Sequence, residues 1–159
     1  MNLPPDQDHP NVRIPPPLIF FAFLCVAGVL EYGVGLKFSW GPIGVWRSIA
    51  LILFLCSGYL ALHSAVVLKK RGTFIDPNKP TIQMVTEGPF RISRNPMYLS
   101  LILVLFGFSI WFPSIWFLLS AIALWLVFNW VAVPPEEVYL EHKFGERYTA
   151  YKARVRRWI

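Results

Sequence analysis

Four apolar runs constrain this chain more than any other feature of its sequence. They cover residues 18–36, 43–68, 97–112 and 115–133. A helix needs about 20 apolar residues to cross the hydrocarbon core of a bilayer. The third run is short for a crossing, so its helix either begins deep in the bilayer or shares the crossing with the preceding loop. The runs predict an all-α integral membrane protein with four transmembrane helices.

The composition excludes two other classes of protein. Of the 159 residues, 55% are hydrophobic and 15% are charged, whereas about 25% charged residues is usual in soluble domains. A soluble domain of this size would leave much of its apolar surface in water. The same numbers exclude a disordered chain, which needs low hydrophobicity.

The basic residues are distributed unevenly along the chain, which carries a net charge of +6. Four spans place both termini and residues 69–95 on one face of the membrane. That face then carries every Lys and Arg except Lys37 and Arg47. The positive-inside rule therefore predicts cytosolic termini and a cytosolic 69–95 loop. No basic helix or RNA-binding signature is present, so the charge does not indicate a nucleic-acid partner.

The chain divides into three parts by composition. Residues 1–17 form a polar, proline-rich tail, and residues 18–68 hold the first two helices. Residues 69–159 hold a long polar loop, a helical hairpin and a C-terminal helix. The hairpin follows from the short Pro113-Ser114 connection, because short connections join antiparallel neighbours. The loop is too long for a simple connection, and such loops are often functional.

The last part of the chain, Pro134–Ile159, predicts one amphipathic cytosolic helix. The Pro134-Pro135-Glu136-Glu137 sequence is typical of a helix start. Apolar and aromatic residues then recur at steps of three and four, namely Leu140, Phe144, Tyr148, Tyr151 and Val155. Such a helix lies on the membrane surface or folds over the loop face, and the periodicity leaves both arrangements open.

The start of the third run is the first candidate binding site. Asn95-Pro96 predicts an N-cap followed by proline at the first helical position. A helix N-terminus is a favourable place for an anion, and Arg91 and Arg94 add positive charge. This end of the helix therefore suits the anionic group of an amphiphilic ligand.

The second candidate is Glu136. It lies four residues before Leu140, at the edge of the apolar stripe and close to the membrane. Its carboxylate could hold a cationic group of a ligand, or it could simply complement the helix N-terminus. The spacing alone does not decide between these roles.

Other polar residues are open to a functional or a structural interpretation. Glu31 is an intramembrane carboxylate, which is a functional hypothesis by default, and His63 is either a base or a structural histidine. The basic C-terminal residues are expected to bind anionic headgroups; they are Arg154, Arg156 and Arg157. The two cysteines lie in apolar runs and no Cys/His cluster occurs, so we expect no metal site.

Two motifs together resemble a known superfamily. Residues 85–98 read Val-Thr-Glu-Gly-Pro-Phe-Arg-Ile-Ser-Arg-Asn-Pro-Met-Tyr, and Glu136-Glu137 opens a second motif that continues through Phe144-Gly145 to Val155. In this order, and separated by a helical hairpin, they are similar to the isoprenylcysteine carboxyl methyltransferase and phospholipid methyltransferase superfamily. The resemblance covers roughly residues 70–158.

The resemblance implies an integral-membrane methyltransferase that uses S-adenosylmethionine, of the short bacterial type and therefore of the bacterial inner membrane. Such enzymes have no Rossmann domain, and no GxGxxG motif occurs here. The implied cofactor pocket faces the cytosol, and a lipophilic acceptor reaches it from the bilayer. The matching cofactor-binding positions are Gln83, Met84, Val85, Phe90, Asn95, Pro96, Met97, Tyr98 and Glu136.

The methyl acceptor stays open. The eukaryotic carboxyl methyltransferases carry a substrate-binding arginine about four residues before the glutamate, and Ala132 stands at that position here. Asn129 and Arg154 are candidate substitutes. An isoprenylcysteine carboxylate, a phospholipid amine, a thiol or another small lipophilic group remain possible acceptors. Two other functions are a membrane reductase of the sterol reductase type that uses NADPH and a non-enzymatic membrane scaffold. The oligomeric state is likewise open.

Overall fold

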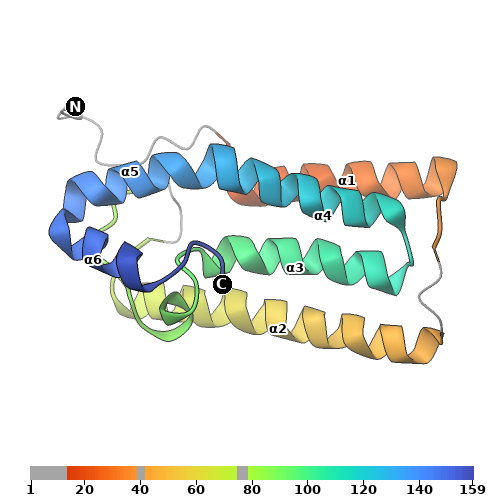
Figure 1. Ribbon diagram of the computed structural model, residues 1–159, viewed down its shortest axis with the longest axis horizontal. Coiled ribbons are helices and arrows are strands. Elements are labelled where there is room, and N and C mark those ends of the chain that lie inside the picture. Colours follow the sequence, from red (N-terminus) through yellow and green to blue (C-terminus); the bar gives the residue numbers. More distant parts are fainter. Residues whose placement is uncertain (1–13, 39–41, 75–78) are drawn as a thin grey trace.

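The computed structural model describes residues 14–38, 42–74 and 79–159, and it confirms the all-helical fold for this part of the chain. Apart from helices, the described residues form one isolated bridge, between Lys37 and Ser114. Four helices lie side by side and form an elongated bundle (Figure 1). They are α1 (Pro16–Val34), α2 (Ile43–Lys70), α3 (Pro96–Trp111) and α4 (Ile115–Val127).

Three helical stretches are long and apolar enough to cross a membrane: Pro16–Val34, Ile43–Lys70 and Ile115–Phe144. The helix α3 is apolar but shorter. Many large apolar side chains of α1 and α2 are exposed, which a bilayer would cover. We therefore treat the chain as an integral membrane protein, whereas the count of four spans stays a prediction.

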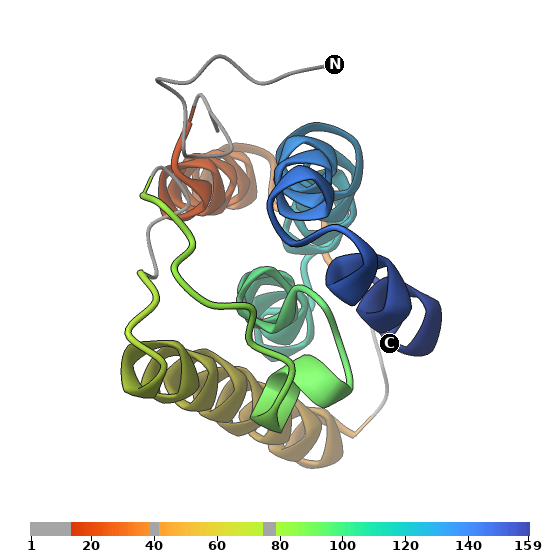
Figure 2. The same cartoon turned by 90° about the vertical axis from the view of Figure 1, so that its left-hand side faces the viewer.

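The helix α3 packs against both α2 and α4, and α1 packs against α4. Seen from the end of the bundle, residues 79–87 run from the side of α1 back to α2 (Figure 2). They lead into a short 3₁₀ helix, η1 (Gly88–Arg91), just before α3. The chain thus covers this end of the bundle.

At the opposite end, the segment after α1 is fixed to the turn between α3 and α4. Ile115 N–H donates to Leu36 O at 3.2 Å, and Phe38 N–H donates to Pro113 O at 3.2 Å. The Ser114 hydroxyl donates to Glu31 Oε2 at 2.6 Å. The intramembrane carboxylate of Glu31 thus has a polar partner in the hairpin turn.

The last helical region differs from the predicted one. The helix α4 continues through a π-helical turn, η2 (Phe128–Ala132), directly into α5 (Val133–Phe144). Proline lacks a backbone donor and its ring collides with the carbonyl four residues earlier. A wider π turn just before Pro134 and Pro135 accommodates both effects without ending the helix.

The prediction of one helix over Pro134–Ile159 is therefore wrong. Gly145, with φ +53°, ends α5, because a left-handed backbone suits glycine and interrupts a helix. A separate short helix, α6 (Glu146–Arg154), follows, and the last residues are not helical. Tyr148 and Tyr151 of the predicted stripe are buried, so α6 folds over the loop face.

We predict that Gly107 is required for the close packing of α2 and α3. A Cβ atom at Gly107 would lie 2.6 Å from the Phe54 ring. Small residues let membrane helices approach closely, and overpacking such a contact costs about 1–3 kcal/mol. Gly107→Ala should lower the thermal unfolding temperature in detergent. Gly28→Ala is the matched control, since nothing lies within 4 Å of its added Cβ, and equal melting of the two variants would contradict the prediction.

Candidate functional site

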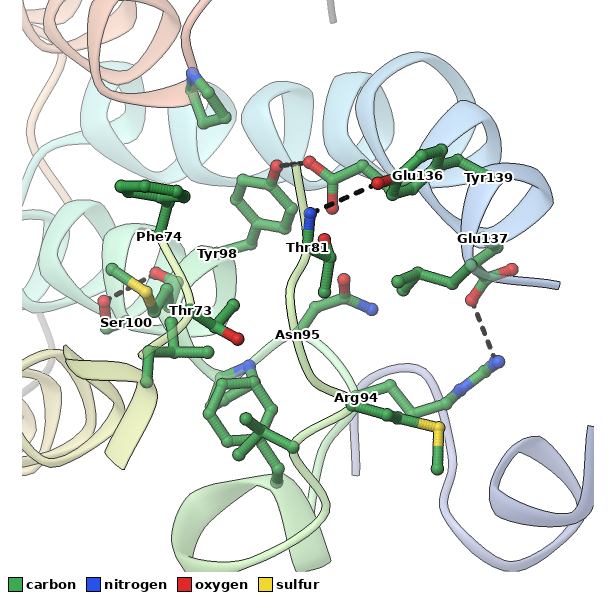
Figure 3. A pocket seen from close by; sticks show the side chains of 18 of the residues that line it. Thr73, Phe74, Thr81, Arg94, Asn95, Tyr98, Ser100, Glu136, Glu137 and Tyr139 are labelled. Atoms are coloured by element: carbon green, nitrogen blue, oxygen red, sulfur yellow. Dashed lines mark hydrogen bonds and ion pairs between the residues drawn. The ribbon is translucent and has the colours of Figure 1, made fainter. Parts of the chain in front are cut away.

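A cavity of about 470 Å³ lies at the end of the bundle that residues 79–87 cover. Its walls come from the starts of α1 and α3, the end of α2, residues 73–74, Thr81, residues 83–85, α5 and α6. Figure 3 shows polar side chains of α3 and α5 facing one another across it. All nine residues that the sequence nominates for cofactor binding line this one cavity: Gln83, Met84, Val85, Phe90, Asn95, Pro96, Met97, Tyr98 and Glu136.

The two motifs meet directly at Tyr98 and Glu136. Tyr98 lies in the first turn of α3 and is 9% exposed, and its hydroxyl donates a hydrogen bond to Glu136 Oε1. Its ring packs on Phe128, with 4.9 Å between the ring centroids. Since the two oxygens of a carboxyl group can accept several hydrogen bonds, Glu136 keeps acceptor capacity for a ligand in the cavity.

The neighbouring carboxylate, Glu137, is buried in an ion-pair cluster. Its Oε1 lies 3.0 Å from Arg94 Nη2 and accepts from Arg157 Nε at 3.1 Å. Its Oε2 accepts from Arg157 Nη2 at 2.6 Å. This hydrogen bond to Glu137 raises the pKa of Arg157. The cluster joins α5, the start of α3 and the C-terminal tail.

Asn129 also binds the C-terminal tail. Its backbone oxygen and its Oδ1 each accept from Arg157 Nη1 at 3.1 Å. Its Oδ1 accepts further from Trp158 Nε1 at 3.0 Å. Asn129, which the sequence nominates as a substrate contact, is absent from the cavity wall, and the described contacts give it an anchoring role in the π turn.

The C-terminal tail in turn holds the first motif. The backbone oxygen of Arg157 accepts from Ser93 Oγ at 3.1 Å and from Asn95 Nδ2 at 3.2 Å. Arg94 N–H donates to Arg156 O at 3.0 Å. Asn95 stands at the N-cap position of α3, but its side chain makes no capping hydrogen bond. The predicted cap is wrong in this respect, because the amide binds the tail instead.

Helix α6 closes one wall of the cavity with two tyrosines. The Tyr151 hydroxyl donates to Phe90 O at 2.6 Å, which fixes α6 to η1. Burial raises the pKa of Tyr148 to about 12, so its hydroxyl stays protonated at neutral pH. The wall is therefore uncharged and aromatic.

Hydrogen bonds between side chains and backbone groups hold Thr73, Thr81 and Gln83. Thr73 Oγ1 donates to Gln83 O and accepts from Gln83 N–H, both at 3.1 Å. The Tyr139 hydroxyl accepts from Thr81 N–H at 3.2 Å. These bonds place Gln83 and Met84 in the cavity wall.

The basic C-terminal residues are not equivalent. Arg154 is exposed, donates from Nε to Ala150 O at 3.2 Å and does not line the cavity. Arg157 was expected to bind headgroups, but its guanidinium is taken up by Glu137 and Asn129. That prediction is wrong for Arg157. The non-helical tail turns inward, and the charge of the tail residues does not predict this turn.

Sequence reasoning also missed cavity residues. The nominated set lacked a group that lies on the same walls: Pro16, Thr73, Phe74, Arg94, Tyr139, Tyr148 and Tyr151. The sequence does indicate Arg94 as a positive charge at the first candidate site, and Tyr148 and Tyr151 as part of the C-terminal stripe, without assigning them to a cofactor. The others reach the cavity through the packing of α1, α2 and α5 around it, which leaves no local signal.

His63 lies outside the cavity wall. Its Nδ1 is 3.0 Å from the Tyr59 hydroxyl. Its ring also packs under η1, because a Cβ at Gly88 would lie 3.3 Å from His63 Nε2. These contacts fit a structural histidine. Among the residues that the structure describes, no group of three His, Cys, Asp or Glu side chains gathers as a metal site would need.

Comparison with known proteins gives two matches. The family model described as phospholipid methyltransferase matches residues 45–147. A protein of Haemophilus influenzae, described as uncharacterized, is 44% identical over 63 residues, which are 40% of this chain and the whole of that protein. No solved structure matches the chain.

We predict that Arg157 stabilises this end of the bundle. Removing its side chain leaves the buried Glu137 with Arg94 as its remaining ionic partner and leaves Asn129 Oδ1 with Trp158 alone. Loss of charged hydrogen bonds of this kind costs about 2 kcal/mol. Arg157→Ala should therefore unfold at lower temperature in detergent than the wild type. Arg156→Ala, which removes an exposed side chain, is the control and should melt normally, and a normal melt for both would contradict the prediction.

Proposed function

The chain belongs to the phospholipid methyltransferase family, and we propose that it transfers a methyl group from S-adenosylmethionine to a lipid at the cytosolic face of the membrane. One observation carries the proposal: two motifs separated by a helical hairpin form a single cavity, where Tyr98 hydrogen-bonds to Glu136. Family membership supports methyl transfer. The methyl donor and the acceptor are the parts that we propose.

The cavity fits the proposed cofactor in size and in chemistry. Small-molecule sites have volumes of about 300–1,000 Å³, and this cavity has about 470 Å³. S-adenosylmethionine carries an ammonium group, for which the Glu136 carboxylate is a suitable partner. Its adenine ring would contact Phe90, Tyr148 or Tyr151, all of which line the wall.

The protein has little covalent chemistry to perform in this reaction. When bound, the cofactor supplies a methyl group already activated on a sulfonium, so the site mainly has to orient the reactants and exclude water. Tyr98 holds the Glu136 carboxylate in place by its hydrogen bond. Thr81, residues 83–85 and two tyrosines of α6 form part of the cavity wall, which limits the access of water.

The acceptor side of the cavity is apolar. Pro16 of α1, Ala61 and Leu68 of α2 and Leu101 of α3 belong to its walls. These residues come from the bundle, whose outer surface is apolar. A lipid acceptor that reaches the cavity from the bilayer between these helices is consistent with this lining.

The distribution of charge supports the proposed orientation. The start of α1, the end of α2, the start of α3 and the C-terminus lie toward the same end of the bundle (Figure 1). Lys37 and Arg47 flank the connection at the other end. The positive-inside rule then places the cavity at the cytosolic face, in a bacterium the cytosolic face of the inner membrane.

We predict that Glu136 is required for cofactor binding. Glu136→Gln removes the charge that faces the ammonium group, and loss of a charged hydrogen bond weakens binding at least about tenfold. Calorimetry of S-adenosylmethionine binding in detergent measures this change. Glu146→Gln, an exposed position on α6, is the control and should bind normally. A folded wild type that is stabilised by NADPH and not by S-adenosylmethionine would overturn the proposal.

We predict that Ala61 borders the path of the lipid acceptor. Ala61→Phe narrows the apolar wall and should lower kcat/KM for the lipid about tenfold, while the Kd for S-adenosylmethionine changes less than about twofold. The assay transfers radiolabelled methyl groups to extracted lipids and to a panel of amines, thiols and prenylcysteines. Leu62→Phe is the matched control, because Leu62 is 71% exposed on the outer face of α2. Label found in water-soluble products, with no difference between the variants, would contradict this assignment.

A further inference from the structure

Arg94 carries an incomplete set of contacts in the wall of the cavity. Its side chain is 9% exposed, and Nη2 forms the ion pair with Glu137 at 3.0 Å. Its other two nitrogens, Nε and Nη1, are buried and have no hydrogen-bond partner. A buried N–H group without an acceptor is costly, and native structures rarely leave two on one side chain. The Tyr148 side chain also hydrogen-bonds to this guanidinium, so Nε and Nη1 are the two nitrogens left for an acceptor on a ligand.

Arg94 shares its ionic partner with a second guanidinium group. Glu137 faces two guanidinium groups, and Arg157 occupies both of its carboxylate oxygens. Arg157 has every nitrogen in use, since Nη1 binds Asn129. Of the two guanidinium groups, that of Arg94 lines the cavity, together with Glu137, and that of Arg157 does not. An anion bound there would satisfy the free N–H groups of Arg94.

The other charged groups nearby narrow the chemistry of this anion. Glu136 lines the same cavity and directly precedes Glu137, the partner of Arg94. Figure 3 shows Glu136 and Arg94 on opposite sides of Asn95. The cavity thus offers a carboxylate for an ammonium group and, close by, a guanidinium for an oxyanion. Guanidinium groups match the geometry of carboxylates and phosphates.

We infer that Arg94 binds the oxyanion of a zwitterionic ligand whose ammonium group lies at Glu136. The inference rests on the proposed function and assigns a further part of the same site. Two ligands of that function have this chemistry: the amino-acid end of S-adenosylmethionine, with a carboxylate, and an ethanolamine headgroup, with a phosphate.

The structure shows that Arg94 and Arg91 have different environments, although the sequence alone does not distinguish them. Arg91 ends η1, is exposed and does not line the cavity. Arg91→Gln is therefore a matched control, with the same change of charge three residues away. A general electrostatic effect of the basic motif would appear in both variants.

The test compares ligands that carry an ammonium group and either contain or lack the oxyanion. The first pair is S-adenosylmethionine and decarboxylated S-adenosylmethionine, measured by calorimetry. The second pair is phosphatidylethanolamine and a long-chain primary alkylamine, each in mixed detergent micelles and measured by thermal stabilisation, since a ligand of the native state raises its stability.

In one of the two pairs, the wild type should bind the ligand with the oxyanion more strongly than the ligand without it. We expect Arg94→Gln to abolish this difference. If the carboxylate binds there, the affinity for S-adenosylmethionine falls about 10- to 100-fold and the affinity for the decarboxylated form stays unchanged. If the phosphate binds there, stabilisation by phosphatidylethanolamine is lost and stabilisation by the alkylamine remains. Arg91→Gln should behave as the wild type in both pairs.

Three results would overturn the inference. If Arg94→Gln loses equal affinity for ligands with and without the oxyanion, Arg94 has a structural role. If this variant binds all four ligands as the wild type does, Arg94 is not part of the binding site. A wild type that distinguishes neither pair would also contradict it. If Arg94→Gln does not fold, Arg94→Lys keeps the charge but loses the planar fork, and it is subject to the same comparison. A wild type that binds no S-adenosylmethionine but prefers phosphatidylethanolamine to the alkylamine would refute the proposed cofactor and retain the oxyanion site.

Discussion

The candidate site depends on the buried contact between Glu137 and the C-terminal tail. Arg157 forms two hydrogen bonds with Glu137, and its own backbone oxygen accepts from Ser93 and Asn95. One residue therefore fixes the start of α3 relative to α5. It adds to the direct contacts between the two motifs, Tyr98 with Glu136 and Arg94 with Glu137. The π turn contributes through Asn129, which binds the same guanidinium.

This arrangement divides the cavity by chemistry. Its charged end contains Glu136 and Arg94, and its opposite wall contains apolar residues of α1, α2 and α3. A soluble, zwitterionic cofactor suits the first part and a lipid chain suits the second. Methyl transfer to a lipid requires this pairing, because the two reactants come from different solvents and must meet where water is limited. The position of the cavity at one end of an apolar bundle meets that requirement.

Much of this could be predicted from the sequence, for identifiable reasons. The length and polarity of the apolar runs determine the helices, and the motif around Asn95 nominates one wall of the cavity. The path of the chain around Pro134 could not be predicted. Two prolines in sequence usually interrupt a helix, but here a widened turn lets the helix continue through them. The roles of Asn129 and Arg157 depend on a tail that folds back about 60 residues along the sequence to Ser93. Neither periodicity nor local charge carries a record of such contacts, and the charge of Arg157 alone indicated the lipid surface.

The central claim is that one cavity, formed by both motifs, holds the methyl donor. Photoaffinity labelling with an azido-adenine analogue of S-adenosylmethionine, followed by mass spectrometry of the labelled peptides, tests it most directly. The account predicts label in residues 83–98 and in residues 136–151, and competition by unlabelled S-adenosylmethionine should remove it from both. Label confined to the opposite end of the bundle, around Lys37 and Pro113, or label that resists competition, would contradict it.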